Sequence, residues 1–237
     1  LAHRLIEHYA LDPRTDKYHV TGVGCASAVP LLRLLGAATP QTPGRRGLVV
    51  AAESMSGLLV RATEEDPRAK TVGSAIFGDG CAAATLEYDP ACAGPRIVAS
   101  TVHQVPGTLD AVRMALSDHD SHLHLARELP DVAAAHLGAA VDDFLRPLGL
   151  TRYAIDHWIC HPGGRRILDC VQEALELSDA AIAVSREVLA ERGNVGTPSI
   201  FYVLHETIRQ RRPGPGERGL LVTIGPGVTI GLMLLAW

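Results

Sequence analysis

The 237-residue sequence predicts an α/β fold, and three observations favour that class. Short β-prone runs alternate with longer segments in which apolar residues recur at helical spacing. Glycine and proline gather at the junctions between these segments, where the chain has to turn. The composition is 47% hydrophobic and 20% charged, so a chain of this length can bury a sizeable core.

The first predicted elements surround a cysteine. Residues 1–11 have apolar side chains on one helical face, and the proline at position 13 ends that helix. Residues 17–25 predict a strand that ends at Cys25, and residues 26–36 follow at once with helical spacing. Cys25 is therefore predicted at the first position of a helix. The exposed N–H groups there lower the pKa of a thiol, so we expect a reactive thiolate.

A fully apolar run comes next. Residues 48–52 predict a strand that is covered on both faces, as in a parallel or mixed sheet beneath helices. Residues 61–71 are charged and are expected to form a connection. Residues 82–88 predict the next strand.

Residues 89–95, which contain proline, glycine and small residues, mark the best internal boundary. We therefore predict two domains, residues 1–92 and residues 93–237. Periodicity and turn residues predict four helices and four strands in the second domain. The helices are 132–148, 165–175, 178–191 and 199–211, and the strands are 96–105, 157–160, 220–224 and 228–236. A polar loop is expected between the first of these strands and residue 129.

Composition excludes several classes of protein. A formal net charge of −4 argues against a surface that binds nucleic acid. The sequence contains no run of 18 apolar residues and no cationic leader, so we expect no membrane association. The five cysteines are an odd number without metal-like spacing, which suits a reducing compartment. These features predict a cytoplasmic protein.

Three polar residues, Cys25, His161 and Asn194, lie at junctions between predicted elements, where α/β folds place their sites. An imidazole can hold a cysteine as a thiolate–imidazolium pair, and an imidazole and an amide can donate hydrogen bonds to a developing oxyanion. Each residue also has a structural interpretation: Cys25 as a buried apolar side chain, His161 in a tight turn, and Asn194 as a helix C-cap. A cysteine hydrolase would use the same residue types.

Five short motifs, in a fixed order over almost the whole chain, help to distinguish between these interpretations of the three residues. They are Gly24-Cys25, Ile76-Phe77-Gly78-Asp79-Gly80, His161-Pro162-Gly163-Gly164, Gly193-Asn194 and Gly225-Pro226-Gly227-Val228-Thr229. In this combination the sequence resembles the type III polyketide synthases, the chalcone and stilbene synthase family. The β-ketoacyl carrier-protein synthases III are the alternative, but they usually have His-Gln-Ala-Asn at the third motif.

The resemblance implies a thiolase fold, with two similar mixed-sheet halves in a five-layered arrangement, and a homodimer. By that comparison, Cys25 would carry the starter and the growing chain as a thioester. His161 and Asn194 would bind the malonyl thioester and stabilise the enolate formed on decarboxylation. Phe77 would orient the malonyl group, although core filling is the alternative for this residue. The implied substrates are an acyl-CoA starter and malonyl-CoA, with no further cofactor and no metal.

The sequence departs from the family pattern at positions that shape the cavity. Leu123 stands where the family has a second gate phenylalanine, and Gly196 stands where a serine is frequent. The turn Gly225-Pro226-Gly227 is also expected to border the cavity. The first half is incomplete at its N-terminus relative to the family, so we expect part of a longer protein; a non-catalytic partial subunit is the alternative.

Polar residues outside these motifs are interpreted as structural. The histidines and aspartates at 118–124 match no standard metal spacing and predict a solvated loop. Asp79 is expected to be a turn residue before a strand. The sequence therefore predicts no metal site.

Overall fold

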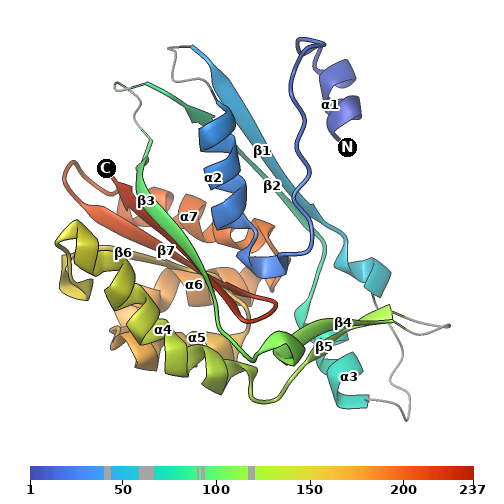
Figure 1. The fold of residues 1–237 in the computed structure, drawn as a ribbon, viewed down its shortest axis with the longest axis vertical. Coiled ribbons are helices and arrows are strands. Elements are labelled where there is room, and N and C mark those ends of the chain that lie inside the picture. Colours follow the sequence, from blue (N-terminus) through green and yellow to red (C-terminus); the bar gives the residue numbers. More distant parts are fainter. Residues whose placement is uncertain (40–43, 59–66, 90, 92–93, 117–120) are drawn as a thin grey trace.

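The structure, a computed structural model, describes the chain except residues 40–43, 59–66, 90, 92–93 and 117–120. It describes the backbone alone at residue 58 and in the segments 67–70, 113–116 and 121–123. Helices and strands alternate along the chain, as predicted, and form two principal sheets with helices against them (Figure 1). Short 3-10 turns are η1 (Gly24–Ala26), η2 (Met55–Leu58), η3 (Leu109–Ala111), η4 (Arg146–Leu148) and η5 (Arg152–Ala154).

The larger sheet has four strands, in the order β3 (Arg96–Gln104), β8 (Thr229–Ala236), β7 (Arg218–Gly225) and β6 (His157–Cys160). β6 pairs with β7 in parallel, whereas the other neighbours are antiparallel, so the sheet is mixed, as predicted. The predicted strand 157–160 has its observed bounds. The two predicted strands near the C-terminus correspond to the hairpin of β7 and β8.

Helices cover both faces of this sheet. They are α2 (Ala28–Ala38), α4 (Leu129–Leu145), α5 (Arg165–Leu175), α6 (Asp179–Arg192) and α7 (Pro198–Arg211). Successive strand side chains point to opposite faces. Leu220 and Val222 of β7 therefore join a core with α4 and α5, while Leu221 joins a core with α2 and α7. Burying each such side chain contributes about 1.5–3 kcal/mol, so β7 anchors the fold.

The smaller sheet is an antiparallel pair, β1 (Arg46–Glu53) and β2 (Gly80–Glu87), and α2 and α7 lie between it and the larger sheet. The described residues thus supply four layers of the predicted arrangement. The expectation that β1 is covered on both faces is wrong: Val49 is 2% exposed, but its neighbour Leu48 is 48% exposed. Helices pack on one face of β1 only in the described part of the chain, so its side chains alternate between buried and exposed.

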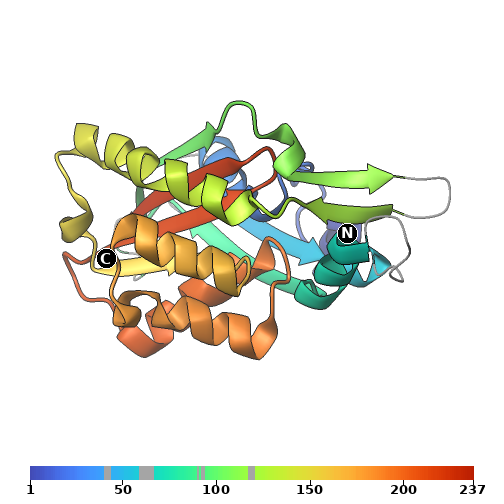
Figure 2. The same cartoon turned by 90° about the horizontal axis from the view of Figure 1, so that it is seen from below.

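A separate hairpin replaces the predicted polar loop before residue 129. It consists of β4 (Val112–Leu116) and β5 (Ser121–Leu125), and it packs against α3 (Pro67–Ile76) while extending away from the larger sheet (Figure 2). Polar and apolar residues alternate along β5, which is the period of a strand. The charged connection predicted at 61–71 is also wrong in part, because α3 begins at Pro67. Residues 118–120 of the predicted polar cluster lie outside the described residues.

The segment before Cys25 is not the predicted strand. Residues 17–23 form no ladder with another segment in the described part of the chain, and strands depend on such hydrogen bonds between neighbours. The predicted first helix is present as α1 (Ala2–His8), and its residues are at least partly exposed.

Two further observations concern the chain as a whole. Among the described helices, none has both the length and the apolar character that crossing a membrane requires. The described cysteines, Cys25, Cys81, Cys160 and Cys170, are free thiols, and Cys92 lies outside the described residues.

Candidate active site

Cys25 lies at the elbow in front of α2. It belongs to the 3-10 turn η1, and Ser27 links this turn to the helix. Gly24 precedes it with a φ of +51°, a left-handed conformation that glycine adopts without steric penalty. The predicted position of Cys25 at a helix start is therefore close to the observed one, since only the short turn separates it from α2.

The turn Gly225-Pro226-Gly227 between β7 and β8 packs directly on this elbow. A Cβ atom on Gly24 would lie 2.8 Å from Cδ of Pro226, and one on Gly225 would lie 2.6 Å from the backbone nitrogen of Ala26. Both glycines therefore permit a close approach of two backbones. This contact positions the cysteine; a role of the turn in bordering a substrate cavity stays a prediction.

Asn194 connects three segments at the site and is only 1% exposed. Its Nδ2 donates to the carbonyl oxygen of Gly163 (3.1 Å), and its Oδ1 accepts from the N–H of Gly196 (3.0 Å). Its backbone N–H donates to the carbonyl of Ile76 (3.3 Å), and its own carbonyl accepts from the N–H of Gly78 (3.0 Å). These bonds hold the amide in one orientation, which a simple helix cap does not require.

His161 follows β6 and is 3% exposed. Its backbone N–H donates to the carbonyl of Val222 (2.8 Å), and its carbonyl accepts from the N–H of Gly163 (2.9 Å). Because Gly163 also binds Asn194, the loops that carry the histidine and the asparagine are joined. Neither ring nitrogen of His161 has a hydrogen-bond partner among the described residues. Buried polar atoms are normally paired, so these two nitrogens are available to a bound molecule.

The protonation states differ from those predicted. Burial, with a smaller contribution from the Glu53 carboxylate, raises the pKa of the Cys25 thiol to about 12, although a hydrogen bond from the Asn194 side chain acts in the opposite direction. Burial lowers the pKa of the His161 imidazole to about 4. The predicted lowered pKa and the thiolate–imidazolium pair are therefore wrong for this structure, in which both groups are neutral at pH 7. Desolvation disfavours both charged forms, and it outweighs a helix-start effect of about 1 kcal/mol.

Glu53 is a site residue that the sequence analysis did not assign. It is the last residue of β1, and its Oε1 accepts a hydrogen bond from the hydroxyl of Thr197 (2.9 Å). That hydroxyl also lies 3.2 Å from the carbonyl oxygen of Gly24, directly before the cysteine. A Cβ on Gly196 would lie 2.9 Å from Cγ of Glu53, so the glycine leaves room for this side chain. The sequence feature that could have identified Glu53 as a site residue is its carboxylate at the end of an apolar strand.

The remaining predicted cavity residues have different outcomes. Phe77 is partly buried and forms an isolated parallel bridge with Asn194, so its backbone lies beside the site. Gly196 follows two residues after Asn194, with a φ of +70°. Leu123 lies opposite Met114 in the hairpin of β4 and β5, and its side chain is outside the described residues. The substrate contacts of these three residues stay predictions.

The residue types at the site suit attack by sulfur on a carbonyl carbon, and the Asn194 side chain forms a hydrogen bond with the Cys25 thiol. A neutral imidazole can accept the proton of a thiol, and the N–H groups of an imidazole and an amide can stabilise an oxyanion. Among the described residues, no group of histidine, cysteine, aspartate or glutamate side chains is arranged to hold a metal ion. The mixed sheets and central helices, together with the cysteine, histidine and asparagine at three loops, define a protein of the thiolase-fold class.

Comparison with known proteins gives the family. The family models described as chalcone and stilbene synthases, N-terminal domain and C-terminal domain, match residues 2–90 and 96–236. The chain belongs to the chalcone and stilbene synthase family, as the motifs indicated. The structure of PKS-I from the brown alga Ectocarpus siliculosus is similar, with a TM-score of 0.88 and 30% sequence identity over 98% of this chain and 63% of that one. The predicted thiolase fold is thereby confirmed.

Two bacterial relatives are similar along almost the whole chain. The 3,5-dihydroxyphenylacetyl-CoA synthase of Amycolatopsis orientalis is 31% identical over 98% of this chain and 63% of its own length. The 1,3,6,8-tetrahydroxynaphthalene synthase of Streptomyces peucetius subsp. caesius is 32% identical over 99% of this chain and 62% of its own length. The chain therefore spans less than two thirds of the length of these relatives.

Proposed function

We propose that the protein is a type III polyketide synthase, an acyltransferase that loads an acyl group from CoA onto Cys25 and extends it with malonyl-CoA. The observation that carries this proposal is the hydrogen-bonded cluster in which Asn194 contacts both Cys25 and the loop of His161, within a family fold. The names of the two bacterial relatives support a hydroxylated aromatic product, formed when the polyketide cyclises.

In the loading step, the Cys25 sulfur attacks the carbonyl carbon of the acyl-CoA thioester. Since the thiol pKa is raised, the thiol proton passes to the neutral His161 imidazole during the attack. The C–S bond to CoA then breaks, and the CoA sulfur takes that proton. The product is an acyl thioester on Cys25 and free CoA.

In the extension step, the malonyl carboxylate leaves as CO₂, and its electron pair forms the enolate of the CoA thioester. N–H groups of Asn194 and His161 stabilise the enolate oxygen. The enolate carbon attacks the carbonyl carbon of the acyl group on Cys25, the C–S bond breaks, and the Cys25 sulfur leaves and takes up a proton. A neutral amide suits this step because a carboxylate in its place would repel the enolate.

Further parts of the proposal rest on the family. We infer a division into residues 1–92, which carry the cysteine, and residues 93–237, which carry the histidine and the asparagine. The substrates are an acyl-CoA starter and malonyl-CoA, without an additional cofactor, and the assembly is a homodimer. Free cysteines and CoA thioester substrates support a cytoplasmic location.

The direct test is acyl loading of the full-length protein, followed by intact mass spectrometry. Cys25→Ala should abolish the acyl adduct and product formation and leave the fold intact, because one small side chain replaces another at a cost of about 1 kcal/mol. Cys81→Ala, which changes an exposed cysteine, is the matched control and should load normally. Product formation by Cys25→Ala at the wild-type rate would refute the assignment.

The division of work between Asn194 and His161 distinguishes a condensing enzyme from a cysteine hydrolase. Asn194→Ala removes an enolate donor, so CO₂ release from labelled malonyl-CoA should fall about 10²–10³-fold, while single-turnover loading of Cys25 stays close to wild type. His161→Ala should impair both steps, because it removes the proton acceptor and an enolate donor together. If Asn194→Ala loses loading as severely as decarboxylation, the asparagine acts by orienting the histidine, as in a hydrolase.

A further inference from the structure

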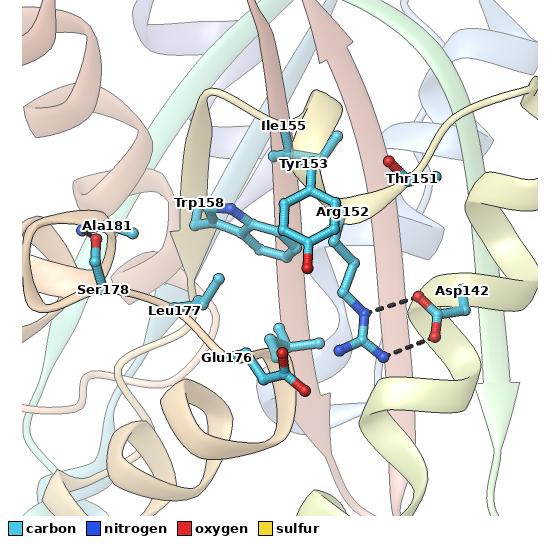
Figure 3. Close-up of a pocket in the computed structure, with 11 residues that line it drawn as sticks. Asp142, Thr151, Arg152, Tyr153, Ile155, Trp158, Glu176, Leu177, Ser178 and Ala181 are labelled. Carbon is cyan, nitrogen blue, oxygen red and sulfur yellow. Dashed lines mark hydrogen bonds and ion pairs between the residues drawn. The ribbon is translucent and has the colours of Figure 1, made fainter.

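A cavity of about 540 Å³ lies outside the site described above, where η5 meets the end of α5 and the start of α6 (Figure 3). Its walls include Asp142 of α4, Arg152 and Tyr153 of η5, Trp158 of β6, and Glu176. Trp158 belongs to the core between the larger sheet and helices α4 and α5, so the cavity reaches from the surface to that core.

The wall of this cavity is held in place before any ligand binds. Arg152 donates two hydrogen bonds to the Asp142 carboxylate, each 2.7 Å long, and a third to the carbonyl of Ala174 (3.2 Å). A Cβ on Gly138 would lie 3.0 Å from an Arg152 guanidinium nitrogen, so this glycine leaves space for the side chain. Preorganised walls reduce the entropy that a ligand loses on binding.

The polar groups of three residues at the cavity have no hydrogen-bond or ion-pair partner in the described part of the chain. The Trp158 side chain belongs to a residue that is 6% exposed, yet its indole N–H meets no acceptor among the described residues. The Glu176 carboxylate likewise has no hydrogen-bond or ion-pair partner in the described part of the chain. Tyr153 lines the same cavity and is 94% exposed. An unpaired donor, a carboxylate acceptor and an exposed aromatic ring thus line one cavity.

The charged side chains that line the cavity indicate which class of ligand it can bind. The Arg152–Asp142 ion pair is neutral as a unit, so the unpaired Glu176 leaves the lining with a net charge of −1. An anion such as a carboxylate or a CoA phosphate would be repelled. The lining also contains the apolar side chains Ile155 and Leu177. A flat apolar ring with hydroxyl groups matches all of these features, because a hydroxyl can accept from the indole N–H and donate to the carboxylate.

We propose that this cavity binds a neutral hydroxylated aromatic molecule, with its ring against Tyr153 and its hydroxyl groups on Trp158 and Glu176. Such a molecule belongs to the class of product that we assign to the enzyme, and that link rests on the proposed function. The chemical class of the ligand is inferred from the residues that line the cavity alone, and it does not depend on the proposed function.

Nuclear magnetic resonance of the full-length protein, labelled with ¹⁵N-tryptophan, tests the site at pH 7. The probe is 1,3-dihydroxynaphthalene, and a Trp158→Phe variant assigns the indole signal. We expect that signal to shift saturably, because the N–H gains an acceptor, while the Trp237 signal stays in place. The anion 2-naphthoate has the same rings, and it should bind about tenfold more weakly because Glu176 repels it. An unmoved Trp158 signal, or naphthoate binding as tight as that of the diol, would overturn the proposal.

Two variants locate the contacts. Tyr153→Ala should weaken binding of the diol about fivefold to tenfold, since it removes a stacking ring without disturbing the core. Tyr88→Ala changes another exposed tyrosine and should have no effect. Glu176→Gln should reduce the preference for the diol over naphthoate about tenfold, because it removes the negative charge. If Tyr153→Ala binds the diol as tightly as wild type, the ligand does not occupy this cavity.

The experiments can refute the proposed catalytic function and the proposed ligand site independently of each other. The titration should give the same affinity in Cys25→Ala, which cannot carry an acyl group. A shift of Trp158 in a protein that forms no polyketide would refute the proposed function and leave the cavity assignment standing. Polyketide formation with no shift of Trp158 would refute the cavity assignment alone.

Discussion

At the scale of single residues, neighbouring groups have opposing effects on the pKa of the Cys25 thiol. Burial and the Glu53 carboxylate raise its pKa to about 12, and the Asn194 side chain lowers it in part. A thiolate is therefore rare at neutral pH in this structure. The proposed loading step therefore needs a proton acceptor at the moment of attack, and the neutral His161 imidazole is the acceptor that we propose.

The first prediction is that Glu53→Gln makes Cys25 more reactive. The substitution removes the negative charge, so the pKa of the thiol falls, and it keeps an oxygen that can accept from the Thr197 hydroxyl. Each unit by which the pKa falls raises the thiolate fraction about tenfold, so alkylation of Cys25 by iodoacetamide at pH 8 should be faster than in wild type. Peptide mass spectrometry measures the rate. Glu87→Gln, at the other end of the same sheet, should leave it unchanged, and an unchanged rate in Glu53→Gln would contradict the electrostatic argument.

The second prediction concerns stability in acid. The pKa of His161 is about 4 in the fold, against 6.5 as its ordinary value, so between these pH values the unfolded chain binds a proton that the folded chain does not. Stability should therefore fall as the pH drops from 6.5 to 4, by about 3 kcal/mol from this residue. Urea unfolding at a series of pH values measures the effect.

His161→Gln has no titrating ring at this position, so its stability should depend less on pH over the same range. His136→Gln replaces an exposed histidine of α4 and should keep the wild-type dependence. Equal pH dependence in His161→Gln and wild type would show that another group titrates in this window.

At the scale of elements, the cysteine elbow and the turn between β7 and β8 form one unit. The third prediction is that Gly225→Ala separates them, because its Cβ would lie 2.6 Å from the backbone nitrogen of Ala26. Overpacking of this kind costs about 1–3 kcal/mol, and the shift of η1 should also slow acyl loading of Cys25. Chemical denaturation and single-turnover loading measure the two effects.

Gly214→Ala is the matched control for this substitution. A Cβ at Gly214 would meet no atom within 4 Å, and the glycine has no left-handed φ. It should therefore leave both stability and loading unchanged. If Gly225→Ala loads at the wild-type rate, the packing of the turn does not position the cysteine.

At the scale of the whole molecule, the two sheets differ in how they are covered. β7 is central in a four-stranded sheet with helices on both faces, whereas β1 and β2 form a pair with one exposed face in the described part of the chain. The fourth prediction is that amide hydrogen exchange of the 237-residue chain is slower in β7 and β8 than in β1 and β2. Mass spectrometry of peptides from each pair measures it, and equal protection of the two pairs would contradict the account.

Local patterns determined much of the fold. The predicted strand 157–160 and helix 165–175 begin and end at the observed residues, because their apolar spacing and flanking glycines act over a few positions. The candidate site residues Cys25, His161 and Asn194 were also indicated by the sequence, since each belongs to a short motif, and their catalytic roles stay predictions. Hairpin β4–β5 was missed because its alternating histidines were interpreted as a polar loop.

The tertiary structure alone decided the state of the site. Desolvation at Cys25, with a smaller effect of the Glu53 charge, raises the pKa of its thiol, opposite to the effect expected from a helix start. Glu53 likewise reaches the site only through long-range contacts. Its carboxylate accepts a hydrogen bond from the hydroxyl of Thr197, and that hydroxyl also lies near the carbonyl oxygen of Gly24. Local sequence patterns thus indicated the candidate residues Cys25, His161 and Asn194 and most of the elements that hold them. Desolvation and long-range contacts, which local periodicity does not encode, decided their protonation and their partners.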